Sequence, residues 1–310
     1  MTALTADASD RRYYRVQPPG GDAFVVALHA APFAPGSLPF VNVAELLTAM
    51  GLPVPRVRDE AADLGILAID DLGDITLQAH VDSAPSPAHH SLYEQAVDHI
   101  VTMQQRGAAL ADVRFVPYGL AFDVEKLMWE MDFFLQHFLQ GFRSLEMTPA
   151  ARTALRSQLL AVVEELAAEP RVLCHRDYHS RNLMVTNDGL AIIDFQDARM
   201  GPDTYDLASL LRDSYVDMPE AMFDRLVAYF RRTAGIADDA AAFRARFDLM
   251  ALQRNLKALG TFGYQAVARA NPAYAQYVPR TLDYVRRGLS THRRFGNLHD
   301  LLADSLPELV

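Results

Sequence analysis

Cysteine is almost absent from this sequence, since Cys174 is the single one among 310 residues. An intramolecular disulfide and a structural thiolate metal site are therefore excluded. No uninterrupted apolar run reaches the length that spans a membrane, and the first residues lack a basic segment followed by a long apolar core. We expect a cytoplasmic protein with a reduced thiol and no membrane partner.

Basic residues are also in deficit. Lysine and arginine number 29 against 39 aspartates and glutamates, so the formal charge is -10, and the pI is near 5.4. Nonspecific nucleic-acid binding needs a basic surface, so this class of partner is not expected. The sequence indicates no particular protein partner. What is present is a 50% share of hydrophobic residues, which allows a sizeable core.

The order of the predicted elements places strands before helices. Paired strands are predicted at 12–16 and 23–28, a helix at 40–50 and a buried strand at 64–69. Further helices are predicted at 91–105, 124–142, 149–168, 205–214, 220–233, 240–268 and 275–292. We therefore expect an α+β protein with a small β-rich lobe at 1–73, which ends in a hinge at 70–73, and a larger, mainly α-helical lobe at 74–310.

Two segments near the middle of the chain carry the chemistry. They are His175–Asn182, which reads H-R-D-Y-H-S-R-N, and Ile192–Gln196, which reads I-I-D-F-Q. Phosphoryl transfer needs a group that orients and deprotonates the acceptor hydroxyl, and hard oxygen ligands for Mg²⁺. We predict Asp177 as the catalytic base, and Asn182 and Asp194 as the metal ligands.

The residues between these two segments predict a β-hairpin. Apolar runs at 183–185 and 190–193 are separated by 186–189, whose Asn-Asp-Gly is a strong turn signal. Such a hairpin would set the two segments facing each other. Their occurrence in this order is much less probable by chance than either segment alone.

These motifs resemble those of the aminoglycoside phosphotransferase and choline kinase-like superfamily, whose loop reads H-x-D-x-x-x-x-N and is followed by I-D-F or I-D-W. Residues 201–211, G-P-D-T-Y-D-L-A-S-L-L, match a further segment of that superfamily. The chain looks most like the bacterial kinases of N-acetylmuramate and N-acetylglucosamine, and the resemblance is sharp from Val172 to Tyr215. It implies a bilobal protein kinase-like fold, with ATP and Mg²⁺ as cofactors. It also implies transfer to the anomeric hydroxyl of either sugar, which gives a sugar 1-phosphate in cell-wall sugar recycling.

The nucleotide site is expected around the first strands and the hinge. Residues 7–12 occupy the position where the family has its phosphate loop, but they lack glycine. Ser9 can donate a hydrogen bond, and Arg11 or Arg12 can pair bidentately with phosphate oxygens, unless these arginines form only a solvated rim. Adenine is expected near Asp70 and Leu72 at the hinge.

The lysine that kinases carry on their third strand is missing, because no lysine precedes Lys126. Leu28 or His29 stands where it would be, so Glu45 on the following helix lacks its usual partner or is simply a solvent-facing residue. Three explanations remain: a pseudokinase, a nucleotide held by arginine, or a subgroup with a different phosphate grip. We favour the last, because the resemblance to the anomeric sugar kinases implies an uncharged residue there.

The acceptor site is expected in the helical lobe. Arg176, Arg181 and Arg212 form a basic set that suits an anionic or neutral sugar better than a cationic acceptor. Trp129 can stack on a pyranose face while Glu130 or Asp132 takes sugar hydroxyls. Alternatively, this segment is an amphipathic helix with its aromatic side chains in the core and its acids in solvent.

Two rival functions remain at this point. A kinase of another small alcohol, such as an aminoglycoside, a choline-like alcohol or a ketosamine, would keep the chemistry and change the pocket. A nucleotide-binding pseudokinase would keep the fold and lose turnover. The intact Asp177, Asn182 and Asp194 argue against the pseudokinase, whereas the absent lysine argues for it.

Overall fold

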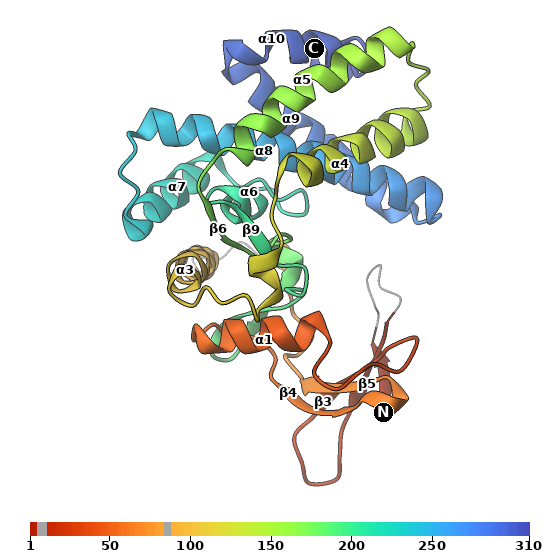
Figure 1. Cartoon of the computed structure of the whole chain (residues 1–310), viewed down its shortest axis with the longest axis vertical. Coiled ribbons are helices and arrows are strands. Elements are labelled where there is room, and N and C mark those ends of the chain that lie inside the picture. The colour runs from red at the N-terminus through yellow and green to blue at the C-terminus, as the bar shows by residue number, and fades with distance from the viewer. Residues whose placement is uncertain (5–10, 84–87) are drawn as a thin grey trace. The chain divides into compact units, whose positions relative to one another are not determined.

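The computed structural model describes residues 1–4, 11–83 and 88–310. Two compact units divide the chain: Met1–Gly119 with Ser180–Ala198, here called the strand unit, and Leu120–His179 with Arg199–Val310, here called the helical unit. The predicted order of a sheet followed by helices is confirmed (Figure 1). The lobe boundary at residue 73 stays a prediction. Within the described ranges, no helix is both long and apolar enough to cross a membrane.

A five-stranded antiparallel sheet begins the strand unit, in the order β1-β2-β3-β5-β4. Its strands are β1 (Thr2–Leu4), β2 (Arg12–Val16), β3 (Phe24–Leu28), β4 (Val57–Ala61) and β5 (Ile66–Asp70). The predicted β2–β3 hairpin is confirmed, with Tyr14 opposite Val26. Helix α1 (Pro39–Ala49) buries Leu46 and Leu47 on its apolar face. Strands β1 and β4 were not predicted.

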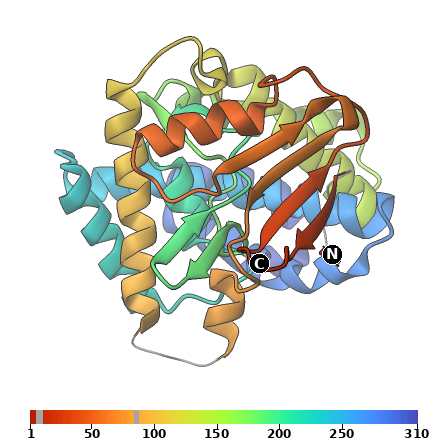
Figure 2. The same cartoon turned by 90° about the horizontal axis from the view of Figure 1, so that it is seen from below.

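The predicted hairpin of the motif region is also confirmed. Strands β7 (Leu183–Thr186) and β8 (Gly189–Ile192) pair in antiparallel fashion, and Gly189 adopts a φ of 114° that favours glycine. Helix α3 (Ala88–Ala109) lies alongside the hairpin (Figure 2), where Gln95 accepts a hydrogen bond from the Leu190 amide. Because Asn182 precedes β7 and Asp194 follows β8, the hairpin brings these two residues together.

The helical unit packs around α8 (Ala240–Gly263), which is buried along most of its length. Helix α8 contacts α4 (Val124–Phe134), α6 (Tyr205–Leu211) and α9 (Val278–Thr291). The Asp239 side chain caps α8 by accepting from the amides of Ala241 and Ala242. The other helices of the unit are α5 (Pro149–Ala167), α7 (Glu220–Ala234) and α10 (Gly296–Ala303).

Two predicted helices change their winding before they end. Helix α4 continues as the π-helical segment η3 (Leu135–Phe142), and α8 continues as η5 (Tyr264–Ala268). The amide of Arg143 donates to the carbonyl of Phe138, five residues back, and Arg269 donates in the same way to Tyr264. Segments η3 and η5 contact each other. Periodicity alone predicts continuous α-helices here, because over so few residues it does not distinguish hydrogen bonds to the fourth residue back from those to the fifth.

A short ladder, β6 (Arg171–Cys174) with β9 (Arg199–Pro202), also belongs to the helical unit. These four-residue strands were not predicted, because they are too short for an alternating pattern and β9 ends in Gly201-Pro202. They matter because β6 leads directly into the His175–Asn182 loop.

Replacement of Gly263 by alanine is expected to destabilise the protein by about 3 kcal/mol. A Cβ at this position would lie 2.3 Å from the His137 carbonyl oxygen and 3.0 Å from the Phe138 Cα, so the backbone of η3 must shift. Gly288→Ala in α9 is the matched control, because nothing lies within 4 Å of its added Cβ. Urea unfolding of both variants is the measurement. Equal stability of the two would contradict the close packing of α8 against η3.

Candidate active site

The loop that follows β6 is held by Asp206, the first acidic residue of α6. The Asp206 carboxylate accepts from the amides of His175, at 2.7 Å, and Arg176, at 3.1 Å. Asp206 is fully buried, and burial raises its pKa. Arg176 adopts the left-handed conformation, with a φ of 87°, which is unfavourable for a residue with a side chain. Asp206 thus fixes the backbone immediately before Asp177.

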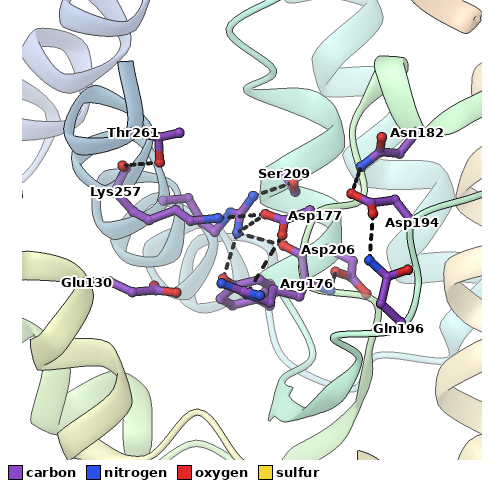
Figure 3. Close-up of polar contacts among 12 residues, drawn as sticks. Glu130, Arg176, Asp177, Asn182, Asp194, Gln196, Asp206, Ser209, Lys257 and Thr261 are labelled. Carbon is purple, nitrogen blue, oxygen red and sulfur yellow. Dashed lines mark hydrogen bonds and ion pairs between the residues drawn. The ribbon is translucent and has the colours of Figure 1, made fainter. Parts of the chain in front are cut away.

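Asp177 lies among cations of the helical unit (Figure 3). Its Oδ1 accepts from Lys257 Nζ at 2.6 Å and lies 3.8 Å from a guanidinium nitrogen of Arg254, while Arg176 Nε is 3.7 Å from its Oδ2. Burial favours the neutral acid, but Lys257, Arg176 and Arg254 outweigh it and hold the pKa of Asp177 well below its ordinary value. Asp177 is therefore ionised throughout the neutral pH range.

Arg254 ties α8 to the loop. It is buried, and it donates to the Arg176 carbonyl at 2.7 Å, to the Tyr205 hydroxyl at 2.6 Å and to Ser209 Oγ at 2.7 Å. Its guanidinium also lies 4.5 Å from the centroid of the Tyr205 ring. Arg254 thus holds the loop through the Arg176 carbonyl, whereas Asp206 holds it through the amides of His175 and Arg176.

A small cavity of about 90 Å³ opens beside Asp177 in the helical unit. Its walls include Lys257, His179, Tyr215 and Phe262. The His179 ring packs edge-on against Tyr215, with 5.1 Å between centroids, and burial lowers the pKa of His179 to about 3. A neutral imidazole, a cation and a carboxylate thus face one cavity.

A larger cavity of about 590 Å³ lies in the strand unit. Its walls include the predicted hinge, residues 70–73, the apolar side chains of Val25 and Ile193, and the polar side chains of Arg11, Arg181, Asn182 and Asp194. The size lies within the usual range for small-molecule sites. An apolar region beside hinge backbone suits a base, and the basic side chains suit phosphates.

Asn182 and Asp194 both line this cavity, and their side chains contact each other in Figure 3. Asn182 Nδ2 lies 3.3 Å from Asp194 Oδ2, and Gln196 Nε2 donates to Asp194 Oδ1 at 2.8 Å. Asp194 has a φ of 63°. Among the described residues, no three His, Cys, Asp or Glu side chains gather to hold a metal ion. An amide oxygen and one carboxylate still fit Mg²⁺, which usually takes one or two carboxylates and completes its shell with water and substrate phosphates.

The remaining nucleotide candidates divide by position. Arg11 lines the strand-unit cavity, whereas Arg12 is exposed on β2 and is not among the cavity walls. Ser9 lies outside the described residues. Leu72 lines the cavity with Asp70. Hydrogen bonds from Arg56 and Arg58 outweigh burial and lower the pKa of Asp70.

The absent third-strand lysine leaves a different arrangement. Leu28 ends β3, and His29 follows it with its amide bonded to the Gly65 carbonyl. Burial and the neighbouring Arg11 lower the pKa of His29. Glu45 is exposed on α1, which favours the solvent-facing interpretation. Two cations therefore lie near the end of β3: Arg12 stands opposite Leu28 in the ladder, and Arg11 acts on His29 and lines the cavity.

The predicted acceptor residues are spread over several places. Arg181 lines the strand-unit cavity, whereas Arg212 lines the helical-unit cavity and pairs with Glu220 at 2.9 Å. Trp129 is 52% exposed, so it is not in the core. Glu130 is fully buried and accepts from Gln253 at 2.8 Å, so it is not in solvent. Their roles as substrate residues stay predictions.

Sequence reasoning missed Lys257 and the function of Asp206. Lys257 lies 80 positions after Asp177 and belongs to a helix whose pattern indicates only burial. The scarcity of lysine was the signal that could have pointed to this residue. Just two of the 29 lysines and arginines, Lys126 and Lys257, are lysines. Asp206 was recognised as part of the family segment 201–211. The motif does not indicate that its carboxylate accepts hydrogen bonds from the amides of the loop at 175–176.

Comparison with known proteins decides the family. A sequence model of the phosphotransferase enzyme family matches residues 1–246. The chain belongs to this family. The phosphotransferase is 32% identical to the N-acetylmuramate/N-acetylglucosamine kinase of Neisseria meningitidis serogroup B, over 100% of this chain and 90% of that protein. It is 33% identical to the kinase of the same name from Pseudomonas aeruginosa, over 99% and 89% of the two chains.

Solved structures show the fold of the phosphotransferase. A choline/ethanolamine kinase family protein from Mesorhizobium loti has a TM-score of 0.61 at 14% identity and covers 98% of this chain and 92% of its own. Aminoglycoside phosphotransferase APH(4)-Ia, in complex with AMP-PNP and hygromycin B, has a TM-score of 0.59 at 19% identity and covers 93% of each chain. The predicted protein kinase-like fold is confirmed, and the protein is a small-molecule phosphotransferase.

Proposed function

We propose that this phosphotransferase uses ATP and Mg²⁺ to phosphorylate the anomeric hydroxyl of N-acetylmuramate or N-acetylglucosamine. The product is a sugar 1-phosphate, and the proposed setting is cell-wall sugar recycling in the cytoplasm. The observation that carries the proposal is the near-complete alignment, at about a third identity, with two kinases named for these sugars. The cation-rich surroundings of Asp177 support it, because a cationic acceptor such as an aminoglycoside would be repelled there.

The proposed chemistry follows from the charges on each residue. Asp177 orients the acceptor hydroxyl, whose oxygen forms a bond to the γ-phosphorus as the bond from phosphorus to the ADP oxygen breaks. Asp177 then accepts the hydroxyl proton. Because the surrounding cations make Asp177 a weak base, it takes the proton late, when bond formation has acidified the hydroxyl. Lys257 keeps Asp177 ionised and oriented through its 2.6 Å contact.

The nucleotide is assigned to the strand-unit cavity. We propose that the base lies against the hinge near Asp70 and Leu72, where backbone groups are within reach, and that Arg11 binds phosphate oxygens in place of the missing lysine. Asn182 and Asp194 would hold the Mg²⁺, whose charge neutralises the phosphate oxygens.

The substrate assay tests the proposal directly. ADP release is measured with Mg-ATP and, in turn, N-acetylmuramate, N-acetylglucosamine, glucose, kanamycin and choline, and phosphorus NMR locates the phosphate on any product. We expect a 1-phosphate of the N-acetylated sugars. Turnover with kanamycin or choline alone would reject the sugar assignment, and no turnover with any acceptor would favour the pseudokinase.

Replacement of Asp194 by alanine is expected to weaken Mg-ATP binding by at least about tenfold, because a carboxylate ligand is lost. Calorimetric titration with ATP, with and without Mg²⁺, measures the effect. The matched control is Asp188→Ala, which removes an exposed carboxylate from the turn of the same hairpin. If the Asp194 variant bound Mg-ATP as tightly as the control, the metal assignment would be wrong.

A further inference from the structure

Lys126 carries a charge that the proposed chemistry does not use. It lies in the first turn of α4, where Asp123 caps the helix by accepting from the Lys126 amide at 2.8 Å. Its Nζ lies 4.0 Å from the centroid of the Trp129 ring, so the ring holds the ammonium in place by a cation–π contact. The side chain is half-buried, and Trp129 is largely exposed beside it.

The surroundings of Lys126 are cationic. Burial, followed by Arg176, Arg199 and Lys257, lowers the pKa of Lys126, whereas Glu130 acts in the opposite direction. Glu130 is already hydrogen-bonded to Gln253. Arg176 and Lys257, two of the cations that act on Lys126, both contact Asp177, and these charged side chains are here called the cationic cluster.

The two lysines differ in their partners. Lys257 forms an ion pair with Asp177 at 2.6 Å, whereas within residues 11–83 and 88–310 no carboxylate lies within ion-pair distance of Lys126. A half-buried ammonium that faces other cations is electrostatically unfavourable by itself. An anion bound at this position would relieve the repulsion, so the cationic cluster is suited to an acidic ligand.

We propose that Lys126, positioned by Trp129, binds the carboxylate of an anionic acceptor sugar and is a specificity-determining residue for N-acetylmuramate. The inference rests on the proposed function. N-acetylmuramate and N-acetylglucosamine share the pyranose ring, the acetamido group and the anomeric hydroxyl, and they differ by the 3-O-lactyl group with its carboxylate. A residue that binds this carboxylate discriminates between the two sugars without touching the reacting hydroxyl. Because Lys126 covers one face of the Trp129 ring, Trp129 serves the sugar site through Lys126.

The test compares both sugars on three proteins: wild type, Lys126→Met and Lys126→Arg. Methionine keeps an unbranched stem against Trp129 and removes the charge, and arginine keeps the charge. For Lys126→Met we expect kcat/KM with N-acetylmuramate to fall by about tenfold to a hundredfold, mainly through KM, as for the loss of a partly exposed charge pair. With N-acetylglucosamine the value should stay within about threefold of wild type. Lys126→Arg should recover most of the loss.

Other outcomes separate the possible failures. Equal losses on both sugars, with a raised KM for ATP, would assign Lys126 to the nucleotide phosphates and overturn the proposal. Unchanged kinetics on both sugars would overturn it as well, while the sugar kinase assignment would stand. If the wild type phosphorylated neither sugar, the proposed function and this inference would fall together. Glu125→Gln, at the exposed neighbouring position, is the control. It should leave the ratio of the kcat/KM values for the two sugars unchanged.

Discussion

Replacement of Asp177 by asparagine is expected to lower kcat by about a thousandfold, as for the loss of a general base, while Mg-ATP binding stays within about twofold of wild type. Asparagine has the same shape and can still accept the hydrogen bond from Lys257, but it cannot take the hydroxyl proton. The residues proposed to bind the nucleotide belong to the strand unit, whereas Asp177 belongs to the helical unit. Binding and turnover should therefore separate, as measured by calorimetry with Mg-ATP and by steady-state kinetics with the sugars.

The control for this variant is Asp300→Asn. Asp300 is an 82% exposed acid of the helical unit, and its replacement should leave kcat unchanged. Thermal melting of both variants shows whether either one is misfolded. Near-normal turnover by a folded Asp177→Asn protein would remove Asp177 from the chemistry.

Asp206→Ala is expected to reduce both stability and turnover, although Asp206 touches no substrate in the proposed chemistry. The buried amide of His175 and the part-buried amide of Arg176 lose their acceptor, at a cost of about 2–4 kcal/mol in the free energy of unfolding. The left-handed conformation of Arg176 also loses its support. We expect kcat to fall by about a hundredfold, because a small misplacement of a catalytic group has an effect of this size.

A graded series distinguishes the loop-holding function of Asp206 from a general loss of folding. Asp206→Asn keeps one oxygen that can accept an amide hydrogen, so its stability and kcat should lie between those of wild type and Asp206→Ala. Asp224→Ala removes an acid that is 66% exposed and is the control. Urea unfolding and kinetics are measured on the same preparations. An alanine variant with unchanged stability would contradict the two amide contacts.

The sequence predicts those parts of the molecule whose determinants lie close together along the chain. The β7–β8 hairpin follows from Asn187-Asp188-Gly189 between apolar runs, and this local signal was sufficient to bring Asn182 and Asp194 together. The β2–β3 hairpin and the helices of the helical unit follow from composition and periodicity in the same way. The family could be named from the motifs, because three of them occur in the expected order.

Contacts between distant helices were not predictable. Nothing in the spacing of α4 or α8 shows that Lys257 reaches Asp177 or that Lys126 belongs to the cationic cluster. Helical periodicity indicates which face is buried, but it does not indicate the partner of a buried charge. Glu130 illustrates the limit: as an acid on an amphipathic helix it was expected in solvent or on sugar, and the structure buries it against Gln253.

The π-helical segments η3 and η5 have a consequence for insertions and deletions. An α-helix turns by about 100° per residue, so the loss of one residue from η3 would re-aim the face of α4 that carries Lys126 and Trp129. A substitution in the same segment keeps the number of residues, so it would leave the direction of that face unchanged. Because η3 packs against η5, a change in length in one is expected to disturb the packing of the other. We therefore expect insertions and deletions in these two segments to be more harmful than substitutions.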